Sequence, residues 1–395
     1  MTELQNVFIV GAVRTAIGDF GGALKDIPPS ALGAKVIAEA VSRAGIAPGD
    51  VQHVVMGQVI QSEPKDAYLA RVAAMNAGIP SAAPALTLNR LCGSGIQAII
   101  SVAQMIQLGE AQIAVAGGAE SMSQSPHVAK GARFGTKMGN IAMLDAMLET
   151  LADPFEGFHM GVTGENVAER YNITREAQDA LAAEGHRRAS AAIAEGRFKE
   201  QILPIELKTR KGVTMFDTDE HVRSDVTVES LAALKPVFKK DGTVTAANAS
   251  GINDGAAALT LASKAAVDAK GLAPLARILS WGHAGVDPEV MGIGPIKAVP
   301  IALARAGLTL ADIDVIEANE AFAAQACAVA NELGFDPDKL NPNGSGIALG
   351  HPVGATGAIL TVKAVYELQR TGGRYALITM CIGGGQGIAL VIERV

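Results

Sequence analysis

The sequence predicts an α/β fold built from two related domains. Hydrophobic residues make up 49% of the chain but aromatic residues only 4%, and 44 residues are glycine. Such a composition is typical of helices packed closely on sheets. A repeated pattern and a set of glycine-rich loops, described below, point the same way. At 395 residues the chain is also long for a single core.

The repeat begins with a helix end. Arg43-Ala44-Gly45-Ile46 recurs as Arg305-Ala306-Gly307-Leu308, 262 residues later. Glycine is a favoured residue just after a helix, so each copy predicts a helix that ends at glycine. A connector and a short buried strand, around Val54 or Ile316, then follow in each copy.

The similarity continues along both halves. Each half has a glycine-rich loop, an apolar helix and a buried strand in the same order. In the first half these are residues 91–95, a helix through Leu108 and residues 113–116, and in the second they are residues 350–354, a helix through Leu368 and residues 375–379. We therefore predict a duplicated α/β domain, with helices on both sides of mixed sheets.

The intervening region, residues 121–248, differs in character because it holds most of the charged stretches. We interpret it as an inserted loop domain, partly helical over residues 174–195. It belongs to an N-terminal domain of residues 1–270, and residues 271–395 form the C-terminal domain.

Composition also limits the classes of partner. The net charge of −7 argues against nucleic acid as the main partner. Three scattered cysteines fit neither a disulfide framework nor a zinc site. The N-terminus lacks a basic lead and a signal-length apolar stretch, and no segment approaches the roughly 20 apolar residues that span a bilayer. We expect a soluble cytoplasmic protein without a metal or a bound cofactor.

Cys92 lies between a strand-like stretch and a helix, with Gly93 and Gly95 beside it. A helix N-terminus lowers the pKa of a thiol, and glycines let a substrate carbonyl approach. The alternative is a buried structural cysteine, and this loop alone does not decide between the two.

Three further positions are candidates for catalysis. His351 occupies the equivalent loop of the second half, where it can meet Cys92 as a base. Cys381 ends a strand and leads into a glycine-rich turn that includes Gly383, where backbone N–H groups can stabilise an oxyanion. Asn319 follows another strand and is either a helix N-cap or a residue that orients water.

Together these segments resemble the thiolase family over essentially the whole chain. The matching segments are residues 13–18, 89–95, 117–123, 248–255, 319–323, 350–352 and 381–385. The likeness is strongest to bacterial biosynthetic acetyl-CoA acetyltransferases, particularly the short-chain β-ketothiolases that feed polyhydroxyalkanoate synthesis.

The resemblance implies a mechanism. Cys92 attacks a thioester carbonyl while His351 takes its proton. Cys381 then deprotonates the methyl group of a second acetyl-CoA, whose carbanion attacks the acyl-cysteine. Asn319 holds a water that forms one oxyanion hole with His351, and the N–H groups of Cys92 and Gly383 form the other.

The resemblance also implies binding residues and an assembly. Coenzyme A would lie over the insertion. Its contacts and those of the acyl group are Arg223, Ser230, Ser250, His159, Met160, Met291 and Phe322. The substrates are acetyl-CoA, short acyl-CoA and 3-ketoacyl-CoA thioesters, and the protein is a homotetramer, a dimer of dimers.

Three other functions compete with this interpretation. A decarboxylating enzyme of the ketoacyl synthase type uses a second histidine or an asparagine where this chain has Cys381. A silent acyl-CoA carrier has no use for two cysteines and a histidine in three glycine-rich loops. A cysteine hydrolase releases the acyl group to water without an acceptor.

Overall fold

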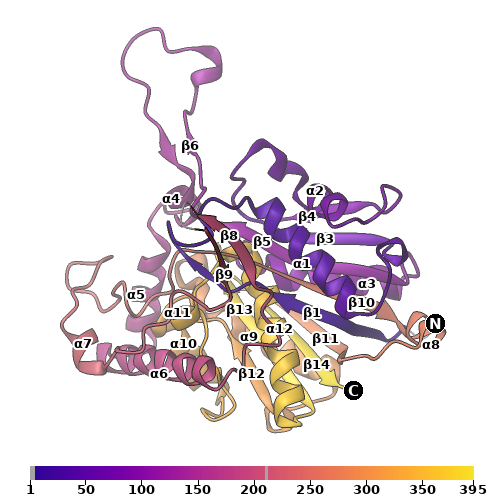
Figure 1. Ribbon diagram of the computed structural model, residues 1–395. Coiled ribbons are helices and arrows are strands. Elements are labelled where there is room, and N and C mark those ends of the chain that lie inside the picture. The colour runs from indigo at the N-terminus through magenta and orange to yellow at the C-terminus, as the bar shows by residue number, and fades with distance from the viewer. Residues whose placement is uncertain (1–4, 210–211) are drawn as a thin grey trace.

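The computed structural model describes residues 5–209 and 212–395, so the predictions made on the first four residues lie outside the described part. In that part, ten strands form one mixed sheet (Figure 1). Nine follow the order β12-β13-β14-β11-β1-β10-β5-β3-β4, and the short β2 pairs with β10. Their bounds are β1 Val7–Arg14, β2 Gly18–Asp19, β3 His53–Gly57, β4 Ala85–Leu88, β5 Ile113–Ser121, β10 Asn253–Ser263, β11 Ala276–Gly285, β12 Val315–Ala318, β13 Tyr375–Ile382 and β14 Gln386–Arg394.

The order of the strands confirms the duplication. β1 and β11 pair antiparallel at the centre of the sheet. Outward from β1 come β10, β5 and β3, and outward from β11 come β14, β13 and β12. The outer pairs β3–β5 and β12–β13 are parallel, while the inner pairs are antiparallel. The two halves therefore share one topology.

The predicted repeat is also present in detail. Helix α1 (Pro29–Arg43) is followed by Gly45 with φ 69°, and α9 (Gly294–Ala306) is followed by Gly307 with φ 68°. This left-handed conformation suits glycine, which has no Cβ. A short 3₁₀ turn then leads into β3 in the first half and into β12 in the second.

Helices cover both faces of the sheet. Alternate residues of β1 point to opposite sides: Val7 and Ile9 join the core under α3 (Ser94–Gln107) and α12 (Val353–Thr371), whereas Phe8 and Val10 join the core under α1 and α2 (Leu69–Asn76). On the second half, α9 packs on the face opposite α12. Helix α12 contacts α3 and strands of both halves.

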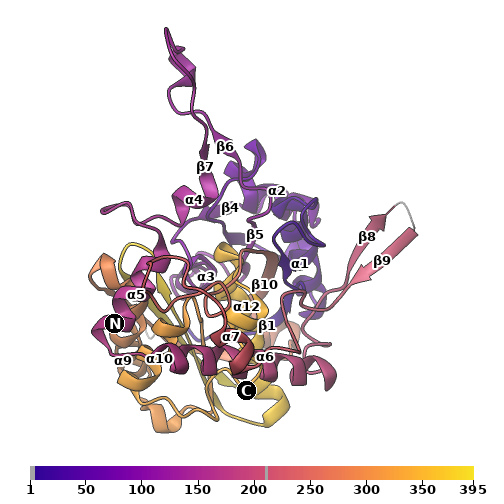
Figure 2. The same cartoon turned by 90° about the vertical axis from the view of Figure 1, so that its left-hand side faces the viewer.

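The segment between β5 and β10 carries smaller elements, including the predicted helix, observed as α6. They are β6 His127–Val128, β7 Leu144–Asp145, α4 Ala146–Thr150, α5 Met160–Arg170, α6 Arg175–Ala194, β8 Ile205–Thr209, β9 Gly212–Phe216 and α7 Val228–Ala232. Residues 127–145, which we call the arm, project away from the body, as does the β8–β9 hairpin (Figures 1 and 2). The division at residues 270 and 271 stays a prediction. The remaining helices are α8 Lys264–Lys270, α10 Ala323–Leu333 and α11 Gly346–Leu349.

Candidate active site

Cys92 lies in a tight turn between β4 and α3. Leu91 has φ 47°, an uncommon conformation for a residue with a branched side chain. The Ser94 hydroxyl fixes the turn because it donates to the Leu91 carbonyl (2.7 Å) and accepts the Arg90 N–H (2.8 Å). The side chain of Cys92 is partly buried and lines a cavity of about 70 Å³. We call this space the acyl cavity.

The prediction that the helix N-terminus lowers the pKa of Cys92 was wrong. Burial raises the pKa of this thiol to about 11, although the N–H groups of Gly383 and of Cys92 itself act in the opposite direction. The negative charge of Glu120 raises it further. Loss of water around the sulfur therefore outweighs the nearby N–H groups. The resting thiol is neutral, so its reaction requires a base.

His351 is placed to be that base. Its side chain is buried and lines the acyl cavity with Cys92. The Thr356 hydroxyl donates to the Pro352 carbonyl (2.9 Å), so its oxygen accepts the proton on His351 Nδ1 (2.7 Å). This assigns a free lone pair to Nε2. Burial lowers the pKa of His351 to about 4, which keeps the ring neutral and able to accept a proton.

The turn before α12 is held by Asn253. Gly350 has φ 107°, and a Cβ there would lie 2.6 Å from the Asn253 side chain. Asn253 Oδ1 accepts the His351 N–H (2.9 Å). Asn253 Nδ2 donates to the Gly18 carbonyl (3.1 Å) and to Asp19 Oδ1 (3.3 Å). The histidine is therefore fixed both through its ring and through its backbone.

Cys92 and His351 meet because their helices touch. A Cβ on Gly357 would lie 2.5 Å from the backbone nitrogen of Ile96, and a Cβ on Gly95 would overlap the backbone nitrogen of Ala358. Helices α3 and α12 therefore pack backbone against backbone near their N-termini. The loop that precedes each helix opens into the same cavity.

Asn319 lies where β12 ends, and it is not a helix cap. Helix α10 begins at Ala323, with Phe322 in the capping position, so the N-cap interpretation was wrong. The Asn319 N–H donates to the Thr379 carbonyl (3.0 Å), and Nδ2 lies 3.5 Å from His351 Nε2. Its Oδ1 is buried without a hydrogen-bond partner among the described residues. The amide therefore faces the ring of His351.

Cys381 is at the end of β13, in an apolar cluster with Met160, Met291 and Phe322. Its pKa is raised by burial and then by the proximity of Cys92, so the two cysteines are close neighbours. The turn that follows includes Gly384 (φ 76°), and the Gly383 N–H interacts with the Cys92 thiol. Oxyanion donors of this kind point at the same carbonyl that a thiol attacks.

The structure brings most of the predicted residues together. The acyl cavity is lined by Cys92, His351, Gly383, Ser250, Met160, Met291 and Phe322. A second cavity of about 480 Å³, the entrance cavity, shares several of these walls and adds His159 and Arg223. Ser230 lines neither cavity, and its hydroxyl oxygen caps the start of α7 by accepting the Thr227 N–H (3.0 Å).

Several cavity residues did not emerge from the sequence. Thr150 and Leu151 come from α4 and the residue after it, at the base of the arm. Phe238 lines the entrance cavity and stacks on His159, with ring centroids 4.7 Å apart. Asp19 and His221 also line this cavity, and His221 Nδ1 lies at hydrogen-bonding distance, 2.5 Å, from Asp19 Oδ1. No local sequence motif predicts these residues, because most of them lie on separate loops of the insertion that come together only in the folded chain.

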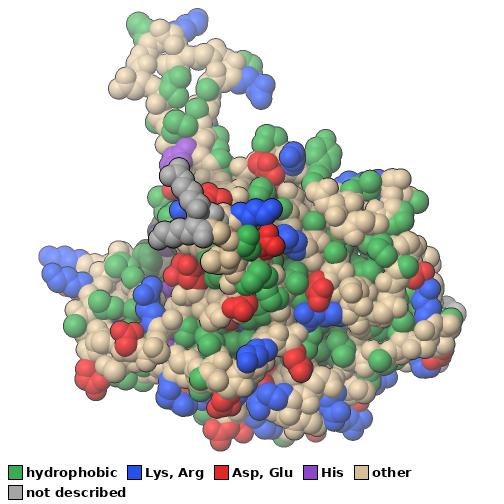
Figure 3. All heavy atoms as spheres, viewed as in Figure 1, with side chains coloured by type: hydrophobic (Ala, Val, Ile, Leu, Met, Phe, Trp, Pro, Cys, Tyr) green, Lys and Arg blue, Asp and Glu red, His purple; other side chains and the backbone are tan. Residues whose placement is uncertain are grey.

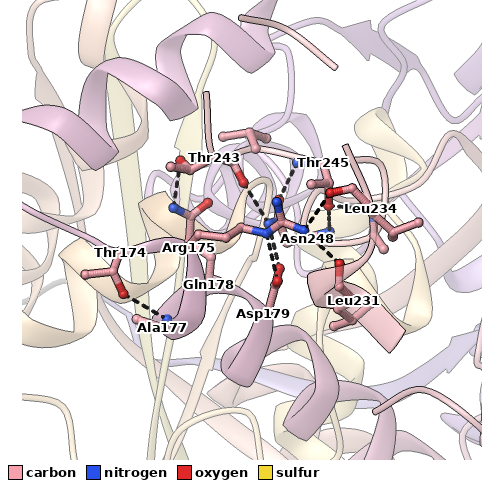
Figure 4. Close-up of polar contacts among 12 residues, drawn as sticks. Thr174, Arg175, Ala177, Gln178, Asp179, Leu231, Leu234, Thr243, Thr245 and Asn248 are labelled. Carbon is pink, nitrogen blue, oxygen red and sulfur yellow. Dashed lines mark hydrogen bonds and ion pairs between the residues drawn. The ribbon is translucent and has the colours of Figure 1, made fainter. Parts of the chain in front are cut away.

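Helix α6 anchors the loop that leads to Ser250 (Figure 4). Asp179 accepts hydrogen bonds from Arg175 Nε (2.7 Å) and Asn248 Nδ2 (3.0 Å). Arg175 also donates to the Leu231 carbonyl (2.7 Å), which ties α7 to α6. The Ser250 N–H in turn donates to the Ala321 carbonyl (2.9 Å). The insertion is thereby fixed to the segment that carries Asn319.

Comparison with known proteins identifies the family. Residues 7–265 match the thiolase N-terminal domain and residues 272–394 match the thiolase C-terminal domain. The chain belongs to the thiolase family. It is 61% identical to the β-ketothiolase BktB of Cupriavidus necator over 392 residues, which cover 99% of this chain and 100% of that protein. It is 51% identical to an acetyl-CoA acetyltransferase of Pseudomonas aeruginosa over 393 residues, with 99% and 100% coverage.

Solved thiolase structures have the same fold. The acetyl-CoA acetyltransferase of Bacillus anthracis superposes with a TM-score of 0.98 at 48% identity and covers all of both chains. Human mitochondrial 3-ketoacyl-CoA thiolase gives a TM-score of 0.97 at 46% identity, with 99% of each chain covered. The predicted fold class is confirmed, and the ketoacyl synthase alternative is not favoured.

Proposed function

We propose that this thiolase catalyses the reversible condensation of acetyl-CoA with a second short acyl-CoA, giving 3-ketoacyl-CoA and free coenzyme A. The observation that carries the proposal is the convergence of a thiol, a neutral imidazole and a second thiol at one cavity. Cys92 and His351 line it, and Cys381 is buried beside Cys92. The identity to β-ketothiolase and acetyl-CoA acetyltransferase relatives supports the same reaction.

In the first half-reaction, Cys92 Sγ attacks the thioester carbonyl while its proton moves to His351 Nε2. The carbonyl oxygen becomes negative and is stabilised by the N–H groups of Cys92 and Gly383, a type of contact worth roughly 3 kcal/mol of barrier. The thioester C–S bond then breaks. Coenzyme A leaves with the proton from His351, and the acetyl group stays on Cys92.

In the second half-reaction, the Cys381 thiol first gives its proton to His351 Nε2, which is neutral again once coenzyme A has left, and the resulting thiolate removes a proton from the methyl group of the second acetyl-CoA. The carbanion attacks the carbonyl of acetyl-Cys92 and forms the new carbon–carbon bond. The Cys92 sulfur then leaves and takes the proton from His351. Asn319, beside His351, would position a water for the enolate oxygen. Thiolysis of a 3-ketoacyl-CoA follows the same steps in reverse.

The coenzyme A portion would occupy the entrance cavity. Ser250 and His159 line this cavity, and Arg223 lies at it as an exposed cation suited to the anionic nucleotide end. Met160, Met291 and Phe322 would surround the acyl group. Because Ser230 lies outside the cavity, its contact with coenzyme A would require the nucleotide to extend over α7.

We also propose a cytoplasmic homotetramer that serves polyhydroxyalkanoate or fatty-acid metabolism. The arm supports the assembly because it projects away from the body (Figure 3). Two of its apolar side chains are almost fully exposed, Phe134 at 93% and Met138 at 90%. Apolar side chains gathered on a projecting segment are typical of an interface between subunits. Among the described residues, no helix is long and apolar enough to cross a membrane.

Incubation with acetyl-CoA alone tests the activity. We expect acetoacetyl-CoA and free coenzyme A to form in equal amounts, with label from acetyl-CoA on the peptide that contains Cys92. A hydrolase would release free thiol without acetoacetyl-CoA. A decarboxylating enzyme would require a malonyl thioester. Either result would contradict the proposed function.

Chain length is a separate prediction. Because methionines, which are flexible, line the acyl cavity, we expect 3-ketovaleryl-CoA to be cleaved at more than about a hundredth of the kcat/KM for acetoacetyl-CoA, a gap below roughly 2.7 kcal/mol. Thiolysis assays across 3-ketoacyl-CoA substrates of increasing length would measure it. A larger difference in kcat/KM would mean that the enzyme is restricted to 3-ketoacyl groups of four carbons.

A further inference from the structure

Glu120 is a fully buried carboxylate near the end of β5, and the mechanism above does not use it. Its Oε2 accepts the N–H groups of Val59 and Gly354, both at 2.9 Å. Its Oε1 accepts the N–H of Ile60 at 3.1 Å. Burial raises the pKa of this carboxyl group to about 8, although the three N–H groups act in the opposite direction.

These N–H groups belong to different halves of the molecule. Val59 follows β3 in the first half, and its side chain lines the acyl cavity. Gly354 is in the first turn of α12 in the second half, three residues after His351. One carboxylate oxygen therefore joins one wall of the cavity to the segment that carries the base.

The two segments that Glu120 joins are packed closely together. The N-terminus of α12 rests on backbone: a Cβ on Gly354 would lie 2.6 Å from Glu120 Oε2 and 2.9 Å from the Cα of Gln58. A Cβ on Gly118 would overlap the Gly354 carbonyl. The contacts of Glu120 therefore act at a place where the backbones of the two segments approach closely and where Val59 and Ile60 pack with Val353.

We propose that Glu120 is a positioning residue for acylation, which holds the His351 segment so that Nε2 faces the Cys92 thiol. The inference rests on the proposed function, because it concerns the rate at which Cys92 is acylated. A misplacement of the base by about 1 Å can reduce a rate about 100-fold. Glu120 itself does not line the acyl cavity, so it acts through the segments that it holds.

Two substitutions test the proposal. Glu120→Gln keeps the shape and one acceptor oxygen but turns an NH₂ group toward a backbone N–H. Glu120→Ala removes both oxygens that accept the three N–H groups. Rapid-quench labelling with radioactive acetyl-CoA measures acetylation of Cys92. We expect acetylation to be about 10-fold slower in Glu120→Gln and about 100-fold slower in Glu120→Ala, with KM for acetyl-CoA within about twofold of the unaltered protein.

Glu165 provides a matched control. This buried carboxylate on α5 also accepts backbone N–H groups, those of Thr243 (2.8 Å) and Val244 (2.9 Å). Glu165→Gln should lower the melting temperature to a similar degree as Glu120→Gln but acetylate Cys92 within about twofold of the unaltered rate. This comparison separates loss of stability from loss of positioning.

Glu120→Gln acetylating Cys92 as fast as Glu165→Gln would overturn the proposal. A raised KM with unchanged kcat would also overturn it, because that result indicates substrate binding. If Glu120→Ala does not fold, Glu120→Gln still decides the question. Failure of the unaltered protein to acetylate Cys92 would instead contradict the proposed function, so the two failures are distinguishable.

Discussion

Burial keeps the reactive side chains of the site neutral. The pKa of Cys92 is raised to about 11, that of Cys381 is raised, and that of His351 is lowered to about 4. In the proposed mechanism, charge therefore appears only when the thiol of Cys92 or of Cys381 gives its proton to His351. In a site with little water, the N–H groups around Cys92 then act on that new charge with full effect.

The two cysteines should fail differently when they are replaced. Cys92→Ala removes the atom that forms the acyl-enzyme, so label from acetyl-CoA should be absent from the protein. Cys381→Ala leaves Cys92 and His351 in place, so it should still be labelled. It should lose about 10²–10⁴-fold in exchange of the acetyl-CoA methyl hydrogens with deuterated solvent, measured by mass spectrometry. A Cys381→Ala enzyme that condenses at the unaltered rate would contradict its assignment as base.

The pH dependence of acylation should reveal the role of His351. Because its pKa is about 4, the ring is neutral from pH 5 to 7 and acylation should be nearly constant there, falling as the pH drops through 4. In His351→Ala only the thiolate can react. With a pKa of about 11 it is about one part in ten thousand at pH 7, and it grows about tenfold per pH unit. In stopped-flow measurements, the acylation rate of the unaltered protein should therefore be constant from pH 5 to 7, whereas that of His351→Ala should rise with pH.

A second histidine serves as the control for that experiment. His53, at the start of β3, lies outside both cavities. His53→Ala should keep the flat profile. A flat profile in His351→Ala would mean that another group accepts the thiol proton.

The sequence named the candidate residues but not the surroundings that set their pKa values. The glycine-rich loops around Cys92, His351 and Cys381 and the resemblance to thiolases predicted these three positions, and their catalytic roles stay a prediction. The pKa of Cys92 could not be predicted, because the sequence indicates a helix N-terminus but the burial of the thiol depends on the tertiary fold. Glu120 was also missed as a site residue because its partners are backbone N–H groups far away in the chain.

At the scale of elements, the site depends on the contact between α3 and α12. Gly95 and Gly357 lie at this contact, and each would place a Cβ against the backbone of the other helix. The repeat could be predicted because its helix ends and strands follow local rules. The contact between α3 and α12 could not be predicted, because the sequence does not show whether a glycine in a helix faces solvent or another helix.

Replacing Gly357 tests that contact. In Gly357→Ala the new Cβ would lie 2.5 Å from the Ile96 nitrogen, which belongs to the backbone and cannot move aside without shifting α3. Overpacking of this kind typically costs about 1–3 kcal/mol. We expect denaturant unfolding to show that loss, with slower acetylation of Cys92 because the two helices move apart.

Gly49 is the corresponding control. A Cβ at Gly49 meets no atom within 4 Å, and its backbone does not need the left-handed conformation. Gly49→Ala should change the free energy of unfolding by less than about 1 kcal/mol and leave acetylation unchanged. Equal effects of the two substitutions would mean that the helix contact is not what Gly357 provides.

At the scale of the whole molecule, the insertion connects the acyl cavity to the surface. Thr150 and Leu151 line the cavity, and they follow directly on the arm through α4. The sequence predicted an insertion here, but the extension of the arm into solvent is a property of the folded chain (Figures 1 and 2). An arm held by another subunit would also hold this wall of the cavity.

The proposed tetramer is tested at the arm. The double variant Phe134→Ser with Met138→Ser replaces the two most exposed apolar side chains of the arm, which are not part of the hydrophobic core. Light scattering after size exclusion should show a tetramer for the unaltered protein and a smaller species for the double variant, whose monomer fold is intact by circular dichroism. Leu108→Ser, 72% exposed after α3 and away from the arm, should remain a tetramer. Because burying apolar surface is the main force that joins subunits, an unchanged mass in the arm variant would remove the arm from the interface.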